Sequence, residues 1–300
     1  MKVAVVGRSG QLAHCLVERA RALDIDLVAL GRPELDLVDP NRVLPVLRRL
    51  EPDIVINAAA MTAVDMAESE VTSAVAINKH GAAQVASAAA SLGVPVIHLS
   101  TDYVFDGAAG RPYTETDAPN PLSVYGVSKL AGEHAVEVAN PRHLILRTAW
   151  VFSPHAANFV RAILAKAATT SEVEVVADQW STPTSGLDLA DAILHAAQVL
   201  VSGDARYGLY HVAGTGVTNR SGQARAALDV SRRLGGPHAA VRDIKTIAAG
   251  LRAPRPRHSA LSSEKFENDF GWRMPDWEDG LETVVARLVE ELSAATERTG

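Results

Sequence analysis

The chain has 300 residues, of which 47% are hydrophobic and 21% are charged, as is usual for a globular protein. Its 35 acidic and 29 basic residues give a net charge of −6, which argues against a protein that binds nucleic acid through a basic surface. The sequence has no apolar stretch of about 18 residues and no charged leader, so we expect no membrane span and a cytoplasmic location.

Short apolar runs alternate with helical patterns through about the first 200 residues. The runs are typical of buried parallel strands and occur at residues 3–6, 27–30, 54–56, 94–99, 144–146 and 173–176. The helical patterns occur at residues 11–23, 42–50, 71–92, 124–138, 159–168 and 187–201. This alternation predicts an α/β fold with a doubly wound, Rossmann-like parallel sheet and helices on both faces.

The pattern becomes less regular after about residue 150. We expect residues 1–150 to form a dinucleotide-binding core, to which residues of about 187–215 return. Residues of about 151–186 and 216–300, which end in an amphipathic helix near 277–293, are expected to form a smaller substrate-binding lobe interleaved with the core.

A glycine-rich turn follows the first predicted strand and opens the first helix. It reads Gly7-x-x-Gly10-x-x-Ala13 and continues through Gln11 and Leu12. Glycine permits a tight turn and a close backbone approach to a pyrophosphate, while the N-terminus of the helix offers free N–H groups to the anion. The turn therefore predicts a dinucleotide site, and a plain glycine turn is the alternative.

The end of the second strand bears on which cofactor binds. A site for NAD usually has an acidic residue here, whereas this chain has Arg32. An arginine can pair with the 2′-phosphate of NADP, so NADP(H) is favoured, while NAD(H) stays open and a solvated surface arginine is the alternative. Asp36 and Leu37 could lie against the adenine, and the small residues after the third strand leave room for the cofactor, among them Ala58 and Ala60.

Three polar residues suggest carbonyl reduction by hydride transfer. Thr101 ends the fourth strand, at the edge where open α/β sheets bind ligands. Tyr125 and Lys129 are four apart on the next helix, so they share one face. A nearby ammonium lowers the pKa of a phenol, which makes the tyrosine usable as an acid and base near neutral pH. The Tyr-x-x-x-Lys spacing alone also occurs by chance in helices.

Together these motifs resemble the extended short-chain dehydrogenase/reductase superfamily and, more narrowly, the dTDP-4-dehydrorhamnose reductase family. The narrow resemblance rests on residues 7–12, 57–65 with 67–68, 100–107, 124–133, 147–151, 178–179 with 183–184, and 255–261. It spans nearly the whole chain. The segments Ser-Thr-Asp-Tyr-Val-Phe at 100–105 and Arg-Pro-x-x-Ser-x-Leu at 255–261 are its most specific parts.

The resemblance implies reduction of the C4 ketone of dTDP-6-deoxy-L-lyxo-4-hexulose to dTDP-L-rhamnose with NAD(P)H. Tyr125 would protonate the developing alkoxide, Lys129 would lower the Tyr125 pKa and hold the nicotinamide ribose, and Thr101 would bind the reacting oxygen. The implied cofactor contacts are Gly7, Gly10, Gln11, Leu12, Arg32, Asp36, Leu37, Ala58, Ala60, Thr62, Tyr125 and Lys129. The implied substrate contacts are Thr62, Val64, Thr101, Asp102, Tyr103, Tyr125, Trp150 and Arg255.

Several alternatives stay open at this point. Trp150 could be a core aromatic residue, and Trp180 stands where the family more often has glycine. The chain could be another nucleotide-sugar reductase or epimerase of the superfamily, or a non-catalytic NADP-binding regulatory subunit. Some family members form dimers with magnesium at the interface. The sequence does not decide whether the chain forms a homodimer or binds Mg²⁺, and we predict no residue as a metal ligand.

Overall fold

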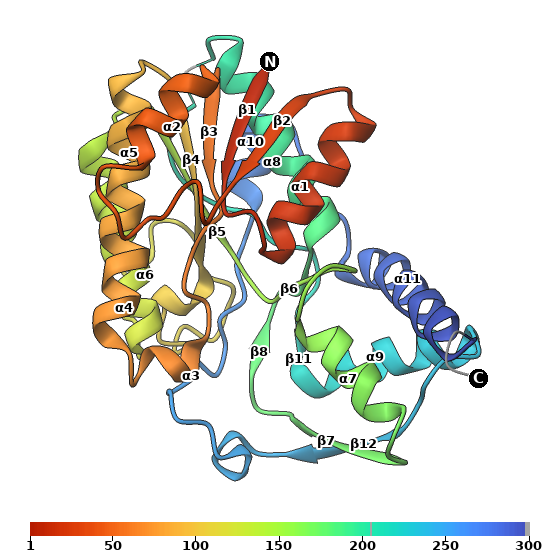
Figure 1. Cartoon of the computed structure of the whole chain (residues 1–300). Coiled ribbons are helices and arrows are strands. Elements are labelled where there is room, and N and C mark those ends of the chain that lie inside the picture. The colour runs from red at the N-terminus through yellow and green to blue at the C-terminus, as the bar shows by residue number, and fades with distance from the viewer. Residues whose placement is uncertain (205, 298–300) are drawn as a thin grey trace.

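The computed structural model describes residues 1–204 and 206–297, and its centre is a parallel sheet. In the described chain this sheet has six strands in the order β10-β5-β4-β3-β1-β2 (Figure 1). Every neighbouring pair in it is parallel. The strands are β1 (Lys2–Val6), β2 (Asp26–Leu30), β3 (Ile54–Asn57), β4 (Val96–Thr101), β5 (His143–Thr148) and β10 (Gly208–His211). The predicted α/β fold is thereby confirmed.

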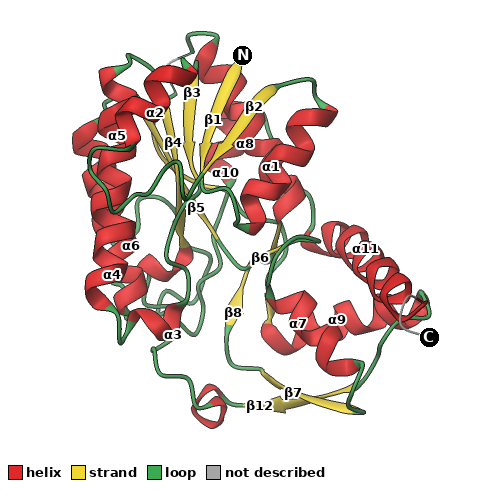
Figure 2. Cartoon of the chain, in the orientation of Figure 1, coloured by secondary structure: helices red, strands yellow, loops and turns green. Residues whose placement is uncertain are grey.

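Helices cover both faces of this sheet because its strands are apolar on both sides (Figure 2). Val3 and Val5 of β1 pack in one core with α1 and α8, whereas Ala4 and Val6 pack in a second core with α2, α5 and α6. The helices are α1 (Gln11–Ala22), α8 (Gly186–Val201), α2 (Val43–Leu50), α5 (Ala82–Ser91) and α6 (Val124–Ala139).

The helix predicted over residues 71–92 is interrupted in its middle. It comprises α4 (Val71–Val75), a π-helical segment (Ala76–Gly81) and α5. Asn78 of the π-helical segment accepts a hydrogen bond from the Met61 backbone N–H at 2.8 Å and donates to the Met61 carbonyl at 3.2 Å. Asn78 also donates to Ser128 Oγ of α6 at 2.9 Å. These hydrogen bonds hold the loop after β3 against α6. π-Helical turns are frequent at functional sites.

The second part of the structure is a lobe below the carboxyl edge of the sheet (Figure 1). Helices α7 (Phe159–Ala167), α9 (Arg220–Arg233) and α11 (Trp277–Glu297) enclose its core with β7 (Glu172–Val176). Strand β7 pairs in parallel with β12 (Ala240–Ile244). The strand predicted at residues 173–176 therefore forms, but it lies in the lobe. One edge strand of the main sheet is β10, which lies within residues 187–215 but is not among the predicted apolar runs.

The chain crosses between the two parts more than once. Phe266 and Phe270 of α10 (Glu264–Phe270) and Met274 pack in the main core with α1 and α8. This stretch belongs to the residues 216–300 that were expected in the lobe, and its apolar side chains fill the core beside Tyr210. The remaining elements are α3 (Val64–Ala67), β6 (Val151–Phe152), β8 (Trp180–Ser181), β9 (Thr184–Ser185), β11 (Thr218–Asn219), and 3₁₀ turns at Asp102–Val104 and Thr246–Ala249.

None of the helices in the described chain combines the length and apolar character needed to span a lipid bilayer.

A buried ion pair ties β5 to α6 in the core of the main domain. The Arg147 guanidinium donates two hydrogen bonds to Glu133, at 2.9 and 2.7 Å, and Ser100 Oγ donates to the same carboxylate. The side chains of Arg147 and Glu133 are only 2% and 4% exposed. Removing one member of such a pair leaves an uncompensated charge in the core.

We therefore expect Arg147→Met to lower the free energy of unfolding by about 3–5 kcal/mol. Chemical denaturation of the variant and the wild type would measure this difference. Arg232→Met, which breaks an exposed pair with Asp229, is the matched control and should change stability by less than about 1 kcal/mol. Equal stability of the two variants would contradict the conclusion that loss of Arg147 leaves an uncompensated buried charge.

Candidate active site

The turn after β1 approaches the end of β3 closely. Gly7 has a φ of +115°, a conformation that side-chain-bearing residues rarely adopt, and a Cβ there would lie 2.8 Å from the Ala59 backbone nitrogen. Gly10 precedes α1 as its N-cap and offers no side chain to the free N–H groups of the helix. The turn therefore leaves backbone N–H groups open beside a narrow gap.

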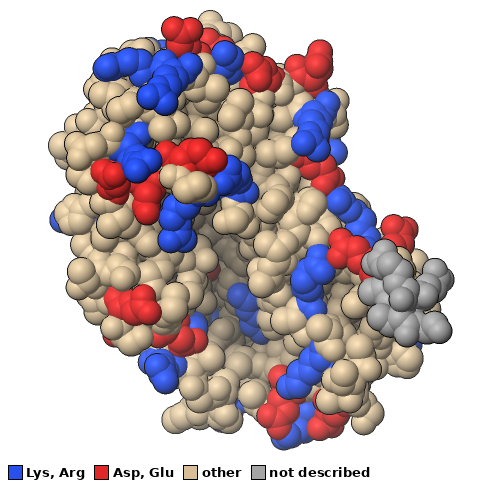
Figure 3. All heavy atoms as spheres, viewed as in Figure 1, with Lys and Arg blue, Asp and Glu red and all other residues tan. Residues whose placement is uncertain are grey.

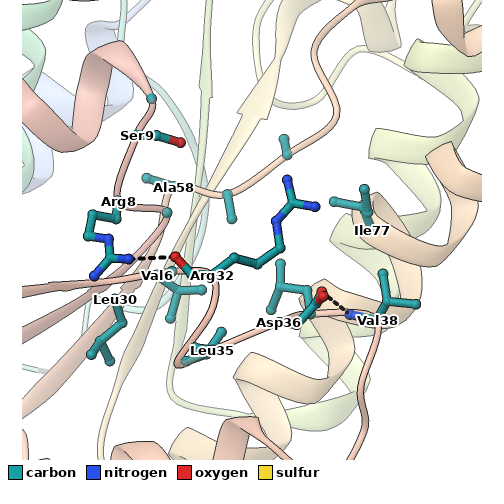
Figure 4. Close-up of a pocket in the computed structure, with 16 residues that line it drawn as sticks. Val6, Arg8, Ser9, Leu30, Arg32, Leu35, Asp36, Val38, Ala58 and Ile77 are labelled. Carbon is teal, nitrogen blue, oxygen red and sulfur yellow. Dashed lines mark hydrogen bonds between the residues drawn. The ribbon is translucent and has the colours of Figure 1, made fainter.

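These residues line a cavity of about 270 Å³ at the carboxyl edge of β1, β2 and β3 (Figure 4). Most of the predicted cofactor contacts lie around it: Gly7, Gly10, Arg32, Asp36, Leu37, Ala58 and Ala60. Gln11 and Leu12 are not in its lining. Gln11 instead donates to the Val151 carbonyl at 3.1 Å, and Leu12 packs against the main core. Thr62 is exposed and also lies outside this lining.

The charged side chains at this cavity come from the loops after β1 and β2. Arg32 extends across it, and Figure 4 shows Asp36 beside Val38, whose backbone N–H donates to the Asp36 carboxylate at 3.0 Å. Arg32 forms no ion pair within residues 1–204 and 206–297. Arg8, which was not predicted as a site residue, lines the cavity and donates to the Arg32 carbonyl at 2.5 Å. Its position within the glycine turn was the available signal.

Thr101 and Tyr125 meet at the end of β4. Thr101 Oγ1 accepts a hydrogen bond from the Tyr103 backbone N–H at 3.2 Å, and its hydroxyl contacts the side chain of Tyr125. Tyr125 lies in the first turn of α6, which begins after the N-cap Ser123. A Cβ at Gly126 would overlap the Tyr103 carbonyl oxygen, so only glycine lets the helix approach this closely. Thr101 and Tyr125 are thus brought together at the carboxyl edge of β4.

Lys129 does not act on the Tyr125 pKa in the way the spacing suggests. Its Nζ donates to the Leu99 carbonyl at 2.6 Å. Burial raises the pKa of Tyr125 above its ordinary value, the contact with Thr101 opposes this shift, and no lysine contributes to it. Burial also lowers the pKa of Lys129 to about 8. The expected pKa lowering at Tyr125 is therefore corrected, because the ammonium turns to a backbone carbonyl and the phenol is desolvated.

The predicted substrate contacts surround this pair. Val64 and Tyr103 pack with Tyr125 in one apolar cluster, and the Tyr103 and Tyr125 ring centres are 5.8 Å apart. Trp150 is buried, with a left-handed φ of 45°, just after β5. Arg255 donates two hydrogen bonds to Asp65, at 2.9 and 3.2 Å, so its charge is already matched.

Asp102 links the end of β4 to two segments of the lobe. Its carboxylate accepts hydrogen bonds from Ser259 Oγ at 2.5 Å, from Ser181 Oγ at 3.3 Å and from Thr101 Oγ1 at 3.2 Å. The side chain is buried. Burial raises the pKa of Asp102 to about 6, while the hydrogen bonds act in the opposite direction.

No group of three or more His, Cys, Asp or Glu side chains in residues 1–204 and 206–297 is placed to hold a metal ion.

Comparisons with known proteins place this geometry in a family. The family model described as "RmlD substrate binding domain" matches residues 1–290. A dTDP-4-dehydrorhamnose reductase of Sinorhizobium fredii is 44% identical over 293 residues, covering 97% of this chain and 99% of the relative. One of Escherichia coli is 38% identical, covering 99% of both chains. The structure of a dTDP-4-dehydrorhamnose reductase from Bacillus anthracis in complex with NADP is similar, with a TM-score of 0.88, 33% identity, and coverage of 95% and 99%.

The buried Asp102 carboxyl should make stability depend on pH. Its pKa is 3.8 ordinarily and about 6 in the fold. The folded state therefore binds this proton more tightly, and the advantage is lost as pH rises through 6. Between pH 4 and pH 7 the free energy of unfolding of the wild type should fall by about 2 kcal/mol relative to Asp102→Asn. Chemical denaturation of both proteins at several pH values would measure it, and parallel pH profiles would contradict it.

Proposed function

The chain belongs to the dTDP-4-dehydrorhamnose reductase family of NAD(P)H-dependent oxidoreductases, and we propose that it reduces the C4 ketone of dTDP-6-deoxy-L-lyxo-4-hexulose to dTDP-L-rhamnose. The observation that carries this proposal is the contact between Thr101 and Tyr125 at the carboxyl edge of β4. This edge also carries the glycine turn of β1 and its cavity. A carbonyl bound between these residues and the cavity would meet a proton donor from the protein.

Tyr125 is the proposed general acid. Reduction of a ketone leaves an alkoxide, which needs a proton from a group within hydrogen-bond reach. Because burial raises the pKa of Tyr125, its hydroxyl stays protonated at neutral pH and is ready to donate. Thr101 Oγ1, fixed by the Tyr103 backbone N–H, is the proposed second contact to the same oxygen. When its hydroxyl donates to the substrate oxygen in place of Asp102, it positions the carbonyl and stabilises the charge that develops there.

Lys129 is proposed to hold the nicotinamide ribose, the other role that the family resemblance implies for it. It lies one helical turn from Tyr125, on the same face of α6. The ammonium is held by the Leu99 carbonyl at 2.6 Å. Its pKa of about 8 means that this charge is present at neutral pH and is lost as the medium becomes alkaline.

The cavity beside the glycine turn fits a dinucleotide. A Cβ at Gly7 would fill the gap to Ala59, and α1 begins with N–H groups that no side chain caps. Bound NADPH would supply the hydride. Gly7, Gly10 and Ala58 would contact the sugar–diphosphate chain of the cofactor. Arg32 has no carboxylate partner among the described residues and would pair with the 2′-phosphate.

The direct test is oxidation of NADPH with the 4-keto sugar nucleotide, followed by identification of the product. Formation of dTDP-L-rhamnose supports the proposal. Binding of NADPH without any turnover of this substrate would contradict it and would favour a non-catalytic NADP-binding role. Turnover of a different 4-keto sugar nucleotide would keep the chemistry and change the substrate.

Tyr125→Phe should lower kcat by a factor of roughly 10² to 10⁴, the usual contribution of a positioned acid. The Kd for NADPH should change little, because the ring still packs against Val64 and Tyr103. Steady-state kinetics and fluorescence titration would measure the two effects. Tyr207→Phe, which removes a hydroxyl bonded to Arg142 far from the cavity, is the control. A Tyr125→Phe rate near that of the wild type would refute the mechanism.

Arg32→Ala should weaken NADPH binding by roughly 10- to 150-fold, since a charge-assisted hydrogen bond contributes about 1.5–3 kcal/mol. Affinity for NADH, which lacks the 2′-phosphate, should stay within about 2-fold. Titration of both cofactors would measure this selectivity. Arg48→Ala, which removes an exposed arginine of α2 outside the cavity, should affect neither. Equal losses for the two cofactors would mean that Arg32 does not bind the 2′-phosphate.

A further inference from the structure

Arg220 of the lobe faces the candidate active site. It is the first residue of α9, and its backbone N–H donates to the Gln179 carbonyl at 3.3 Å. Its guanidinium carbon lies 3.6 Å from the ring centre of Trp150 and 4.8 Å from that of Phe159. Stacking on aromatic faces fixes the plane of a guanidinium and leaves its edge of N–H groups free for polar partners.

The polar partners of Arg220 do not neutralise its charge. Nη1 donates to Gln223 Oε1 at 3.1 Å, and the guanidinium also contacts the Tyr103 side chain. Both partners are uncharged, and no carboxylate in the described chain forms an ion pair with Arg220. A guanidinium has five N–H donors, so these two partners leave part of its capacity unused.

Two other arginines with buried guanidinium groups or contacts to Tyr103 are arranged differently. Arg255, which also contacts Tyr103, is bonded through two nitrogens to Asp65, and Arg147 is bonded in the same way to Glu133. Their charges are matched within the protein. Arg220 is the basic residue next to Tyr103 that keeps an unmatched charge.

The surroundings of Arg220 make this unmatched charge costly. Burial lowers the pKa of Arg220 to about 10, although Tyr103 and Asp102 act in the opposite direction. The Arg220 side chain is partly buried, and a guanidinium that gives up hydration without gaining a matching anion lowers the stability of the fold. Such groups cluster at functional sites, where a ligand supplies the missing charge. Figure 3 shows a hollow between the main domain and the lobe with basic side chains along its edge.

We propose that Arg220 binds the diphosphate of the nucleotide-sugar substrate, an inference that rests on the proposed function. A diphosphate carries two negative charges and presents pairs of oxygens that match the two-pronged edge of a guanidinium. Tyr103 links Arg220 to Tyr125. It contacts Arg220, and its ring centre lies 5.8 Å from that of Tyr125. The anion would thus lie on the lobe side of the sugar whose ketone faces Tyr125.

Binding of dTDP and of thymidine, measured by calorimetry without turnover, tests this role. The two ligands share base and sugar and differ in the diphosphate. The variants are Arg220→Met, which removes the charge, and Arg220→Lys, which keeps a charge but loses the two-pronged edge. Arg225→Met is the matched control, because Arg225 lies on the same helix and pairs with Asp243 at the surface.

The wild type should bind dTDP more tightly than thymidine. Arg220→Met should lose roughly 10- to 100-fold in dTDP affinity while its thymidine affinity stays within about 2-fold. Arg220→Lys should lose an intermediate part of the dTDP affinity, and Arg225→Met should lose none. Equal losses for both ligands in Arg220→Met would overturn the proposal, because they would mean that Arg220 only supports Trp150.

Two further measurements distinguish a loss of the diphosphate contact from misfolding of the variant and from failure of the proposed function. Thermal unfolding of each variant shows whether it is folded; if Arg220→Met is not, Arg220→Lys decides, and an unchanged dTDP affinity in it overturns the proposal. Turnover of the 4-keto sugar nucleotide by the wild type tests the proposed function alone. Arg220-dependent dTDP binding without that turnover would leave a diphosphate site in a protein of different activity.

Discussion

The close approach of α6 to the end of β4 is the constraint on which the candidate site depends. Two glycines of α6, at positions 126 and 132, make it possible. A Cβ at Gly126 would overlap the Tyr103 carbonyl, and one at Gly132 would overlap the Asn78 carbonyl of the π-helical segment. Without side chains at these two positions, the helix lies directly on the backbone that follows β3 and β4. Tyr125 is then within contact of Thr101, and Lys129 reaches the Leu99 carbonyl.

The lobe is joined to this site through a buried carboxylate. Asp102 follows Thr101 directly, and it accepts hydrogen bonds from Ser181 of β8 and from Ser259 of the extended segment that follows Arg255. A carboxylate in such a place lowers stability at neutral pH, because burial raises its pKa. The same bonds fix the position of the lobe relative to the Thr101 hydroxyl. The hydrogen bonds that fix the lobe at Asp102 therefore require a buried carboxylate, which lowers the stability of the fold at neutral pH.

The sequence was sufficient for the features that depend on periodicity and on backbone space. The strands of the main sheet up to β5, the helix carrying Tyr125 and the turn at Gly7 were predicted because buried parallel strands are apolar and tight turns need glycine. The strand at residues 173–176 was predicted as a strand, but its partner β12 lies far along the chain. The π-helical segment was not predicted, since its Asn78 bonds to Met61 and Ser128 depend on tertiary packing.

Spacing in the sequence gives the location of a charged side chain but not its partner. Lys129 lies one turn from Tyr125 as predicted, yet its ammonium bonds to Leu99. Arg255 lies near the site, yet Asp65, almost two hundred residues earlier, neutralises it. Arg220 belongs to no motif, and it becomes notable only when its uncharged partners and its stack on Trp150 are seen together. Which arginine can accept a ligand anion is therefore decided by which carboxylates the fold brings near, a property of long-range contacts that local sequence does not contain.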